Sequence, residues 1–307
     1  MMAVNPVVLL LGATGQIGKL IAEQLCHNRL IRLVVATRRQ DKLNDLEKIY
    51  GHSTYIDLDD PRTFPNALKD VNRLFLLTGY SVAMLAQSKA IIDVAKKAGV
   101  GHITHLGVFS PEWDCTDPHF GWHQMIEVYI KHSQLKWTFL HPNCFLQNLT
   151  AFSLIKNGKF RWYTDKPCGW IALEDVAEAA AKILIEGPTT HHEKDYWFST
   201  EALNLYEVAK VLTEVTERNI IADLQPAEQF LKDMGAESQT FDPYFYSVAE
   251  SFKQIQDGRM SYIGNVTDDI QILLNRKGLS LDQWANKHKR ELIDLLDEQA
   301  KKGITWG

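Results

Sequence analysis

The sequence predicts an α/β fold built on an open parallel sheet that helices cover on both faces. Short apolar runs alternate with amphipathic stretches through the first half of the 307-residue chain. This alternation is the pattern of repeated β-α-β units. The first apolar run also ends in a glycine-rich turn that leads directly into a helical pattern, as in the first unit of a doubly wound sheet.

Each element follows from the spacing of its apolar residues. Continuous apolar runs bounded by turn residues predict buried strands, and apolar residues repeating every three or four positions predict helices. The expected strands are 7–11, 33–37, 55–58, 73–78, 102–107 and 137–141, and the expected helices between them are 19–25, 62–69, 82–98 and 122–132.

After Pro142 the alternation loosens. Helical patterns at 175–185, 205–216 and 227–235 are separated by short strand-like pieces such as 196–199. We expect residues 1–150 to form a nucleotide-binding domain of this doubly wound type. Residues 151–307 are then a smaller substrate lobe, from which the chain contributes back to the sheet edge.

Charge and cysteine content narrow the function classes. The formal net charge is −5, so we expect no direct binding to nucleic acid or to an anionic membrane. The four cysteines lack C-x-x-C spacing and partner histidines, which favours reduced thiols over disulfides or a metal site. The chain starts directly in the first strand, and no apolar run is long enough to span a bilayer. These features indicate a cytoplasmic protein.

The turn after the first strand reads G-x-x-G-x-x-G. A strand, a tight glycine turn and a helix together present backbone N–H groups and the positive helix end to a pyrophosphate. We therefore expect a dinucleotide to bind here, unless the glycines only make a sharp turn. The expected contacts are Gly12, Thr14, Gly15, Gln16, Ile17 and Gly18.

The second strand ends in Arg38-Arg39, with Lys42 shortly after. An acidic residue at this point would hold the ribose 2′-OH of NAD, whereas an arginine accommodates the 2′-phosphate of NADP. Arg38 is therefore predicted to pair with the phosphate, and Lys42 to add a point charge. The alternative is a solvated basic loop before the next helix.

These motifs resemble the NmrA-like branch of the atypical short-chain dehydrogenase/reductase superfamily, on the side of its bacterial NAD(P)H quinone oxidoreductases and triphenylmethane reductases. The resemblance is carried by residues 12–18 with Arg38, and by residues 95–100, 123–127, 137–148 and 171–177. It implies a Rossmann-type fold with NADP(H) on the glycine loop and a variable C-terminal substrate lobe.

The resemblance also implies further cofactor contacts. Asp57 stands where relatives bind the adenine amino group, although a plain loop carboxylate is equally consistent with its position. The end of the fourth strand runs beside the cofactor's ribose in related folds, and the segment after the sixth strand contacts nicotinamide and substrate. The residues concerned are Leu77, Thr78, Gly79, Pro142, Asn143 and Phe145.

The expected catalytic helix departs from the superfamily's Tyr-x-x-x-Lys pair. It reads His119-x-x-x-His123-x-x-x-Glu127, which places the two histidines one turn apart. A histidine near its ordinary pKa can protonate an acceptor oxygen, so His123 and His119 are the candidate catalytic residues. Alternatively, His123 caps the helix or packs, and Glu127 pairs with a surface cation.

The expected function is NADPH-dependent reduction of a quinone-like or other conjugated small molecule. Flat, electron-poor acceptors need little acid catalysis once hydride is aligned, so the missing Tyr-Lys pair is tolerable. One alternative is an NADP(H)-binding redox sensor that acts through a protein partner. Another is a nonredox isomerase or epimerase. The aromatic residues that suggest a flat substrate are Trp113, Phe120, Trp122, Phe145, Trp162 and Trp170.

Overall fold

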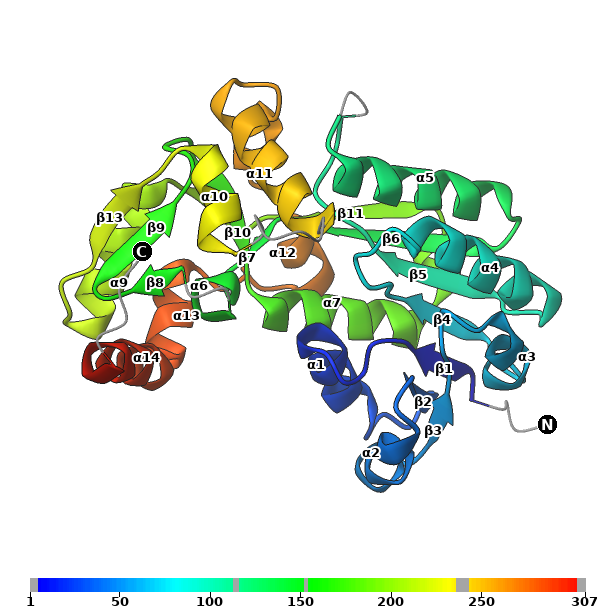
Figure 1. Cartoon of the computed structure of the whole chain (residues 1–307). Coiled ribbons are helices and arrows are strands. Elements are labelled where there is room, and N and C mark those ends of the chain that lie inside the picture. Colours follow the sequence, from blue (N-terminus) through cyan, green and yellow to red (C-terminus); the bar gives the residue numbers. More distant parts are fainter. Residues whose placement is uncertain (1–4, 113–115, 152–153, 236–242, 303–307) are drawn as a thin grey trace. The chain divides into compact units, whose positions relative to one another are not determined.

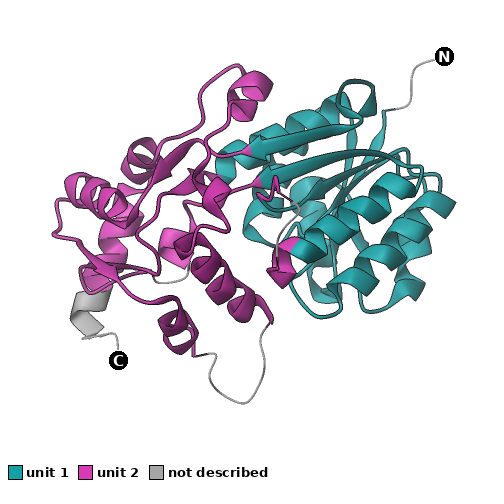
Figure 2. Cartoon of the chain, turned by 90° about the horizontal axis from the view of Figure 1, so that it is seen from above, with its two compact units in different colours: residues 1–108, 121–141, 173–197 teal, residues 109–120, 142–172, 198–307 magenta. Residues whose placement is uncertain are grey.

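A computed structural model of the chain describes residues 5–112, 116–151, 154–235 and 243–302. The chain divides into two compact units, which Figure 2 distinguishes by colour. Unit 1 contains residues 1–108, 121–141 and 173–197, and unit 2 contains residues 109–120, 142–172 and 198–307.

Unit 1 is built on a seven-stranded sheet with the order β11-β6-β5-β4-β1-β2-β3. The pairs from β3 across to β6 are parallel, so the predicted doubly wound, Rossmann-type sheet is confirmed. Its strands are β1 (Val7–Leu10), β2 (Arg32–Thr37), β3 (Ser53–Tyr55), β4 (Arg73–Leu76), β5 (His102–Leu106), β6 (Lys136–Pro142) and β11 (Lys194–Phe198).

Helices cover both faces of this sheet. In Figure 1, α5 and α7 lie on opposite sides of it, and α1 packs along α7. Because both faces are covered, β1 and β5 are buried along their whole length, as expected for a parallel sheet. The helices are α1 (Gln16–Leu25), α2 (Leu43–Tyr50), α3 (Phe64–Ala67), α4 (Met84–Lys97), α5 (Pro118–His132), α7 (Leu173–Glu186) and α8 (Pro188–His191).

Unit 2 contains two three-stranded sheets, ordered β12-β10-β7 and β13-β9-β8. Its strands are β7 (Cys144–Phe145), β8 (Ile155–Lys156), β9 (Lys159–Trp162), β10 (Cys168–Ile171), β12 (Glu201–Leu203) and β13 (Ile221–Leu224). Its helices are α6 (Asn148–Ala151), α9 (Leu205–Thr216), α10 (Ala227–Asp233), α11 (Pro243–Gln256), α12 (Asp269–Leu274), α13 (Leu281–Lys287) and α14 (Lys289–Lys302).

A buried arginine organises part of unit 2. Arg161 on β9 donates to Asp223 on β13 at 2.8 Å and to Asp233 on α10 at 2.9 Å. Tyr163 donates its hydroxyl to Asp233 at 2.8 Å. Because the buried guanidinium has both carboxylates as partners, this network ties a strand pair to a helix. Removing the arginine would leave the two carboxylates without a counter-charge.

Several local predictions differ from the structure: α2 is not among the expected helices, and α5 begins at Pro118 rather than at 122. The third strand is Ser53–Tyr55 rather than 55–58, because pairing with β2 ends at Thr37 opposite Tyr55. The turn after it begins at Asp57, whose Oδ1 accepts from the Asp59 N–H at 3.0 Å. The following helix is split into a 3₁₀ turn, Pro61–Thr63, and the short α3.

The compact units are discontinuous in sequence, unlike the division at residue 150 expected above. The chain returns to the sheet edge as β11, and α7, α8 and β11 all belong to unit 1. Among the residues that the structure describes, none of the helices is both long and apolar enough to cross a bilayer.

Candidate functional site

The glycine turn after β1 is tight, with its backbone atoms packed closely against one another. Gly12 has a φ of +73°, a conformation that L side chains rarely adopt. The Gly15 N–H donates to the Gly12 carbonyl at 2.9 Å. A Cβ at Gly18 would lie only 2.1 Å from that same carbonyl oxygen. Gly18 therefore allows the first turn of α1 to pack closely against the backbone of the turn that follows β1.

Gly15 differs from the other two glycines. It is exposed and precedes α1 with extended backbone angles, φ −87° and ψ 171°. A Cβ at Gly15 would meet only the Gly12 carbonyl oxygen, at 3.3 Å. Since the first N–H groups of a helix have no intrahelical partner, the open side of this turn is suited to an anion.

A cavity of about 670 Å³ lies beside the turn in unit 1. It opens where β1, β2 and β4 end, which is the edge where ligands bind in open parallel sheets. Six residues predicted to contact the cofactor line it: Gly12, Thr14, Arg38, Asp57, Leu77 and Gly79.

The cations after β2 have different neighbours. Arg38 is exposed and lines the cavity. Arg39 donates to Asp41 through two nitrogens, at 3.2 and 2.7 Å, and the Lys42 ammonium lies 3.7 Å from Asp45. Among these cations, only Arg38 borders the cavity, so it is the one best placed to meet a phosphate there.

One polar atom beside the cavity has no partner among the described residues. The hydroxyl oxygen of Thr78, between Leu77 and Gly79, is buried and makes no hydrogen bond. A buried hydroxyl without a partner is costly. This hydroxyl, together with the glycine turn, fits a ligand that carries both an anionic group and hydrogen-bonding groups, as a dinucleotide does.

Helix α5 presents a stripe of ionisable residues to the sheet, one per turn: His123, Glu127 and Lys131. His123 is buried, and its Nδ1 lies 3.1 Å from Nε2 of His105 on β5. Burial lowers the pKa of His105 to about 3, so His105 is neutral at physiological pH. His123 is therefore packed within the helix and does not cap it, since α5 begins at Pro118.

His119 has separate surroundings. Its ring makes edge contacts with Phe120 and Tyr244, at centroid distances of 6.0 and 6.1 Å. Burial lowers the pKa of His119 to about 4, which makes it a poor proton donor near neutral pH. His119 belongs to unit 2 and His123 to unit 1.

Glu127 is not the surface ion pair considered above. Its side chain is 9% exposed, and its Oε1 lies 3.6 Å from His141 Nδ1. The pKa of Glu127 is raised to about 7, mainly by burial; the nearby Asp195 also raises it, whereas His141 and Lys131 lower it.

Two partners of Glu127, His141 and Asp195, are not among the residues predicted from the sequence. His141 is an isolated histidine in an apolar strand, and that pattern was the only signal for it. Asp195 gave none, because it comes from β11, far along the chain. Gly107 makes room for the Glu127 carboxyl group, since a Cβ at this position would lie 2.6 Å from Glu127 Oε1.

The predicted nicotinamide contacts after β6 lie in unit 2. Asn143 is buried and donates through Nδ2 to the Ile263 carbonyl at 2.8 Å, while its Oδ1 accepts from the Cys144 N–H at 2.9 Å. Its amide therefore supports the local backbone. For Pro142, Asn143 and Phe145 a cofactor contact stays a prediction, as it does for Gly15, Gln16, Ile17 and Gly18.

The aromatic residues have varied surroundings. Trp122 stacks on Tyr80 with ring centroids 5.4 Å apart, and Tyr80 lines the cavity. Trp162 and Trp170 are buried within unit 2 and pack against each other at 5.3 Å. Trp113 lies outside the described residues. Trp122 is thus the tryptophan of this set that the structure connects to the cavity, through Tyr80.

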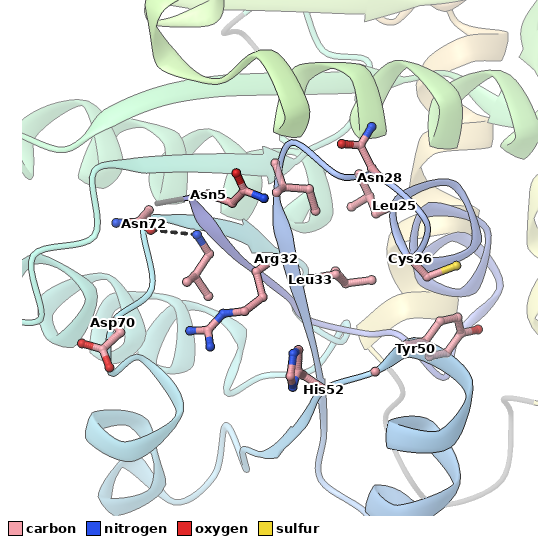
Figure 3. Close-up of a pocket in the computed structure, with 13 residues that line it drawn as sticks. Asn5, Leu25, Cys26, Asn28, Arg32, Leu33, Tyr50, His52, Asp70 and Asn72 are labelled. Atoms are coloured by element: carbon pink, nitrogen blue, oxygen red, sulfur yellow. Dashed lines mark hydrogen bonds between the residues drawn. The ribbon is translucent and has the colours of Figure 1, made fainter. Parts of the chain in front are cut away.

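A second concavity, of about 990 Å³, lies at the opposite edge of the unit 1 sheet, where β1 and β2 begin. Figure 3 shows Arg32, His52, Asp70 and Asn72 around it, with Asn72 bonded to the backbone N–H of Val7 at 2.7 Å. Helices α1 and α2 end here, so their negative ends disfavour an anion. This concavity is not the predicted dinucleotide site.

The chain is similar to proteins that differ in activity. The chain is 25% identical over 291 residues to an NAD(P)H azoreductase from Xenophilus azovorans, covering 92% of this chain and 97% of the relative. Its fold matches that of a Citrobacter sp. triphenylmethane reductase solved with NADP(H), with a TM-score of 0.78, 21% identity, and 92% and 99% coverage. It also matches NmrA, a negative transcriptional regulator solved with NAD, with a TM-score of 0.72, 16% identity, and 98% and 99% coverage.

The model of the NmrA-like family matches residues 5–291, which is nearly the whole chain. This match agrees with the parallel sheet, the glycine turn after β1 and the cavity at the carboxyl edge. The chain therefore belongs to the NmrA-like family.

Proposed function

We propose that this protein is an NADPH-dependent reductase of a conjugated small molecule, such as a quinone, an azo compound or a triarylmethane dye. The observation that carries the proposal is the cavity at the ends of β1, β2 and β4, which joins the glycine turn to Arg38. The relatives whose names describe an NAD(P)H azoreductase and a triphenylmethane reductase support the same chemistry.

Several residues would hold the dinucleotide. The turn from Gly12 to Gly18 would receive the pyrophosphate, Arg38 the 2′-phosphate and Thr78 a ribose or amide group. When bound, NADPH supplies a hydride to the acceptor. The protein's part is to orient the two reactants, which by itself can account for much of a rate enhancement.

The acceptor also needs a proton when its reduced form carries charge on oxygen or nitrogen. We propose that His123 donates this proton. The His105–His123 contact fixes one ring nitrogen of His123, and a histidine so oriented is a common general acid.

Cofactor preference gives the first test. Arg38→Ala should weaken NADPH binding roughly ten- to hundredfold, because a charge-assisted hydrogen bond contributes ~1.5–3 kcal/mol. NADH affinity should stay unchanged, since NADH lacks the 2′-phosphate. Titration calorimetry with both cofactors measures this.

Arg39→Ala is the matched control, because Arg39 is already paired with Asp41 and should affect NADPH affinity little. Equal affinities of the unmodified protein for NADPH and NADH would refute the assignment of Arg38.

Turnover gives the second test. NADPH oxidation is followed with a panel of quinones, azo compounds and triarylmethane dyes. Turnover of any of them supports the reductase. Tight NADPH binding with no turnover of any acceptor would instead favour the sensor, and conversion of a sugar nucleotide without net NADPH loss would favour the epimerase.

A further inference from the structure

Three ionisable side chains meet on the face of the unit 1 sheet that α5 covers. Glu127 comes from α5, His141 from β6 and Asp195 from β11. Glu127 Oε1 lies 3.6 Å from His141 Nδ1, and His141 Nε2 lies 3.1 Å from Asp195 Oδ1. The side chains of His141 and Glu127 are 3% and 9% exposed, whereas that of Asp195 is 34% exposed. The cluster thus connects a solvent-accessible carboxylate to a buried one.

The contacts of His141 place hydrogens on the ring. Its Nδ1 lies 3.1 Å from the Val108 carbonyl oxygen, which only accepts, so Nδ1 carries a hydrogen. Its Nε2 lies 3.1 Å from Asp195 Oδ1, within hydrogen-bond distance. The Trp197 ring stacks on His141 at a centroid distance of 3.9 Å and fixes the ring plane.

Glu127 occupies the space beside the end of β5. The missing side chain of Gly107 makes room for its carboxyl group, because a Cβ there would lie 2.6 Å from Oε1. The backbone of Gly107 itself is tied to β6 through its N–H, which donates to the Leu140 carbonyl at 2.8 Å. The carboxyl group therefore lies at the carboxyl end of the sheet, the edge where ligands bind in this class of fold.

The charged and titratable groups around Glu127 come from four elements. Lys131 and His123 lie one turn away on α5, His105 is on β5, His141 on β6 and Asp195 on β11. Burial raises the pKa of Glu127 to about 7, so near neutral pH a large share of Glu127 carries a proton.

We propose that Glu127, His141 and Asp195 form a proton-holding cluster that resupplies His123, its neighbour one helical turn away. This inference rests on the reductase function proposed above. Residues four apart on a helix are neighbours on one face, so Glu127 and His123 lie on the same face of α5, and the proposal requires proton transfer between them.

The proposed step balances for a quinone. The hydride brings one hydrogen and an electron pair, so NADPH is oxidised and the quinone is reduced to an anion. An O–H bond then forms on that anion as an N–H bond of His123 breaks. The Glu127 O–H bond breaks to restore the proton of His123, and a solvent proton returns through Asp195 and His141.

A metal ion is the competing occupant, because the three residues offer ligand atoms within 4.8 Å of one another. Two observations favour a proton. The Lys131 ammonium lies 4.0 Å from Asp195 Oδ2, so a positive charge already stands beside the cluster. His141 Nδ1 also faces a carbonyl oxygen, which leaves it a donor.

Infrared spectroscopy of the whole protein without added cofactor tests the cluster directly. The wild type should show the C=O stretch of a protonated carboxyl group that disappears as pH rises through about 7. The component of this band that titrates near pH 7 should be absent in Glu127→Gln and should remain in Glu47→Gln, which changes an exposed carboxylate on α2. A component from Asp117, whose pKa burial raises to about 6, should remain in both variants and disappear in Asp117→Asn. A wild type without the component that titrates near pH 7, or such a component that survives in Glu127→Gln, would overturn the proposal.

A comparison of two acceptors tests the role in turnover. A quinone needs hydride and a proton, whereas a cationic triarylmethane dye becomes neutral on gaining hydride alone. Glu127→Gln should lower the ratio of quinone to dye turnover about tenfold or more, which is less than the roughly 10²-fold loss expected when the acid itself is removed, because Glu127 only resupplies His123. Glu47→Gln should leave the ratio unchanged. An equal loss with both acceptors would show a structural role and overturn the proposal.

Two further outcomes are decisive. Stoichiometric binding of Zn²⁺ that is lost in Glu127→Gln and Asp195→Asn, and that removes the infrared band, would assign the cluster to a metal. If the wild type reduces neither acceptor, the reductase function fails, and the infrared band still decides whether the cluster holds a proton.

Discussion

At the scale of single residues, His123 and His105 form a pair that joins α5 to β5. Their ring nitrogens lie 3.1 Å apart, and His105 stays neutral because burial lowers its pKa to about 3. A neutral partner can fix the tautomer and orientation of His123 without taking its proton. His123 is therefore the better candidate donor of the two histidines on α5, since burial lowers the pKa of His119 to about 4.

Replacing His123 tests this role. His123→Ala should lower quinone turnover about 10²-fold or more, because general acid catalysis contributes at least that much. NADPH affinity should change far less, since the predicted phosphate contacts lie at the glycine turn and Arg38. Steady-state kinetics and calorimetry on the same preparation separate the two effects, and His119→Ala serves as the matched comparison on the same helix. Unchanged turnover in His123→Ala would leave a reductase that relies on alignment alone.

At the scale of elements, the β1–α1 turn uses its glycines for two different purposes. Gly18 lets the helix approach the strand, because a Cβ there would lie 2.1 Å from the Gly12 carbonyl oxygen. Gly15 is exposed at the start of α1, where a side chain would meet little of the protein itself. We therefore expect Gly18 to matter for folding and Gly15 for ligand binding.

Two valine substitutions should separate these purposes. Gly15→Val should abolish dinucleotide binding and leave the melting temperature nearly unchanged, because the side chain would block the pyrophosphate. Gly18→Val should lower the melting temperature, since the backbone atoms that it meets cannot move aside cheaply. Thermal unfolding and NADPH titration of both variants measure this. Retained NADPH binding in Gly15→Val would mean that the loop is only a structural turn.

At the scale of the whole molecule, buried ionisable groups make stability depend on pH in opposing directions. Burial lowers the pKa values of His102 and His105 to about 3, so the folded state binds fewer protons than the unfolded state. Their contribution is present above pH ~6.5 and is lost as pH falls below it. Glu127 has the opposite effect on stability. Because burial raises its pKa to about 7, the folded state binds more protons than the unfolded state, and the free energy of unfolding rises as pH falls below 7.

The histidine contribution can be isolated with one variant. Each buried histidine that stays neutral should lower the free energy of unfolding at pH 5 by on the order of 2 kcal/mol relative to pH 8. His102→Gln keeps a donor for Thr138, which accepts from His102 at 2.9 Å. Denaturant unfolding at pH 5 and 8 should show a smaller loss of stability in this variant, while His27→Gln, at an exposed position, should match the wild type. An equal loss in His102→Gln would exclude His102 as a source of the acid sensitivity.

The sequence by itself determined the parallel sheet, the glycine turn and the position of Arg38. These features depend on neighbours along the chain, because apolar runs and tight turns are constrained locally. The bounds of single elements were less well predicted, because the ends of a strand such as β3 depend on its pairing with β2.

Only the tertiary structure decided the surroundings of Glu127. Its partners His141 and Asp195 come from strands far along the sequence, and Asp195 lies in a segment that returns to the edge of the sheet as β11. Whether a glutamate is a solvated surface charge or a buried proton holder depends on which strands its helix covers. That choice is made by packing between distant segments, and no local spacing of residues encodes it.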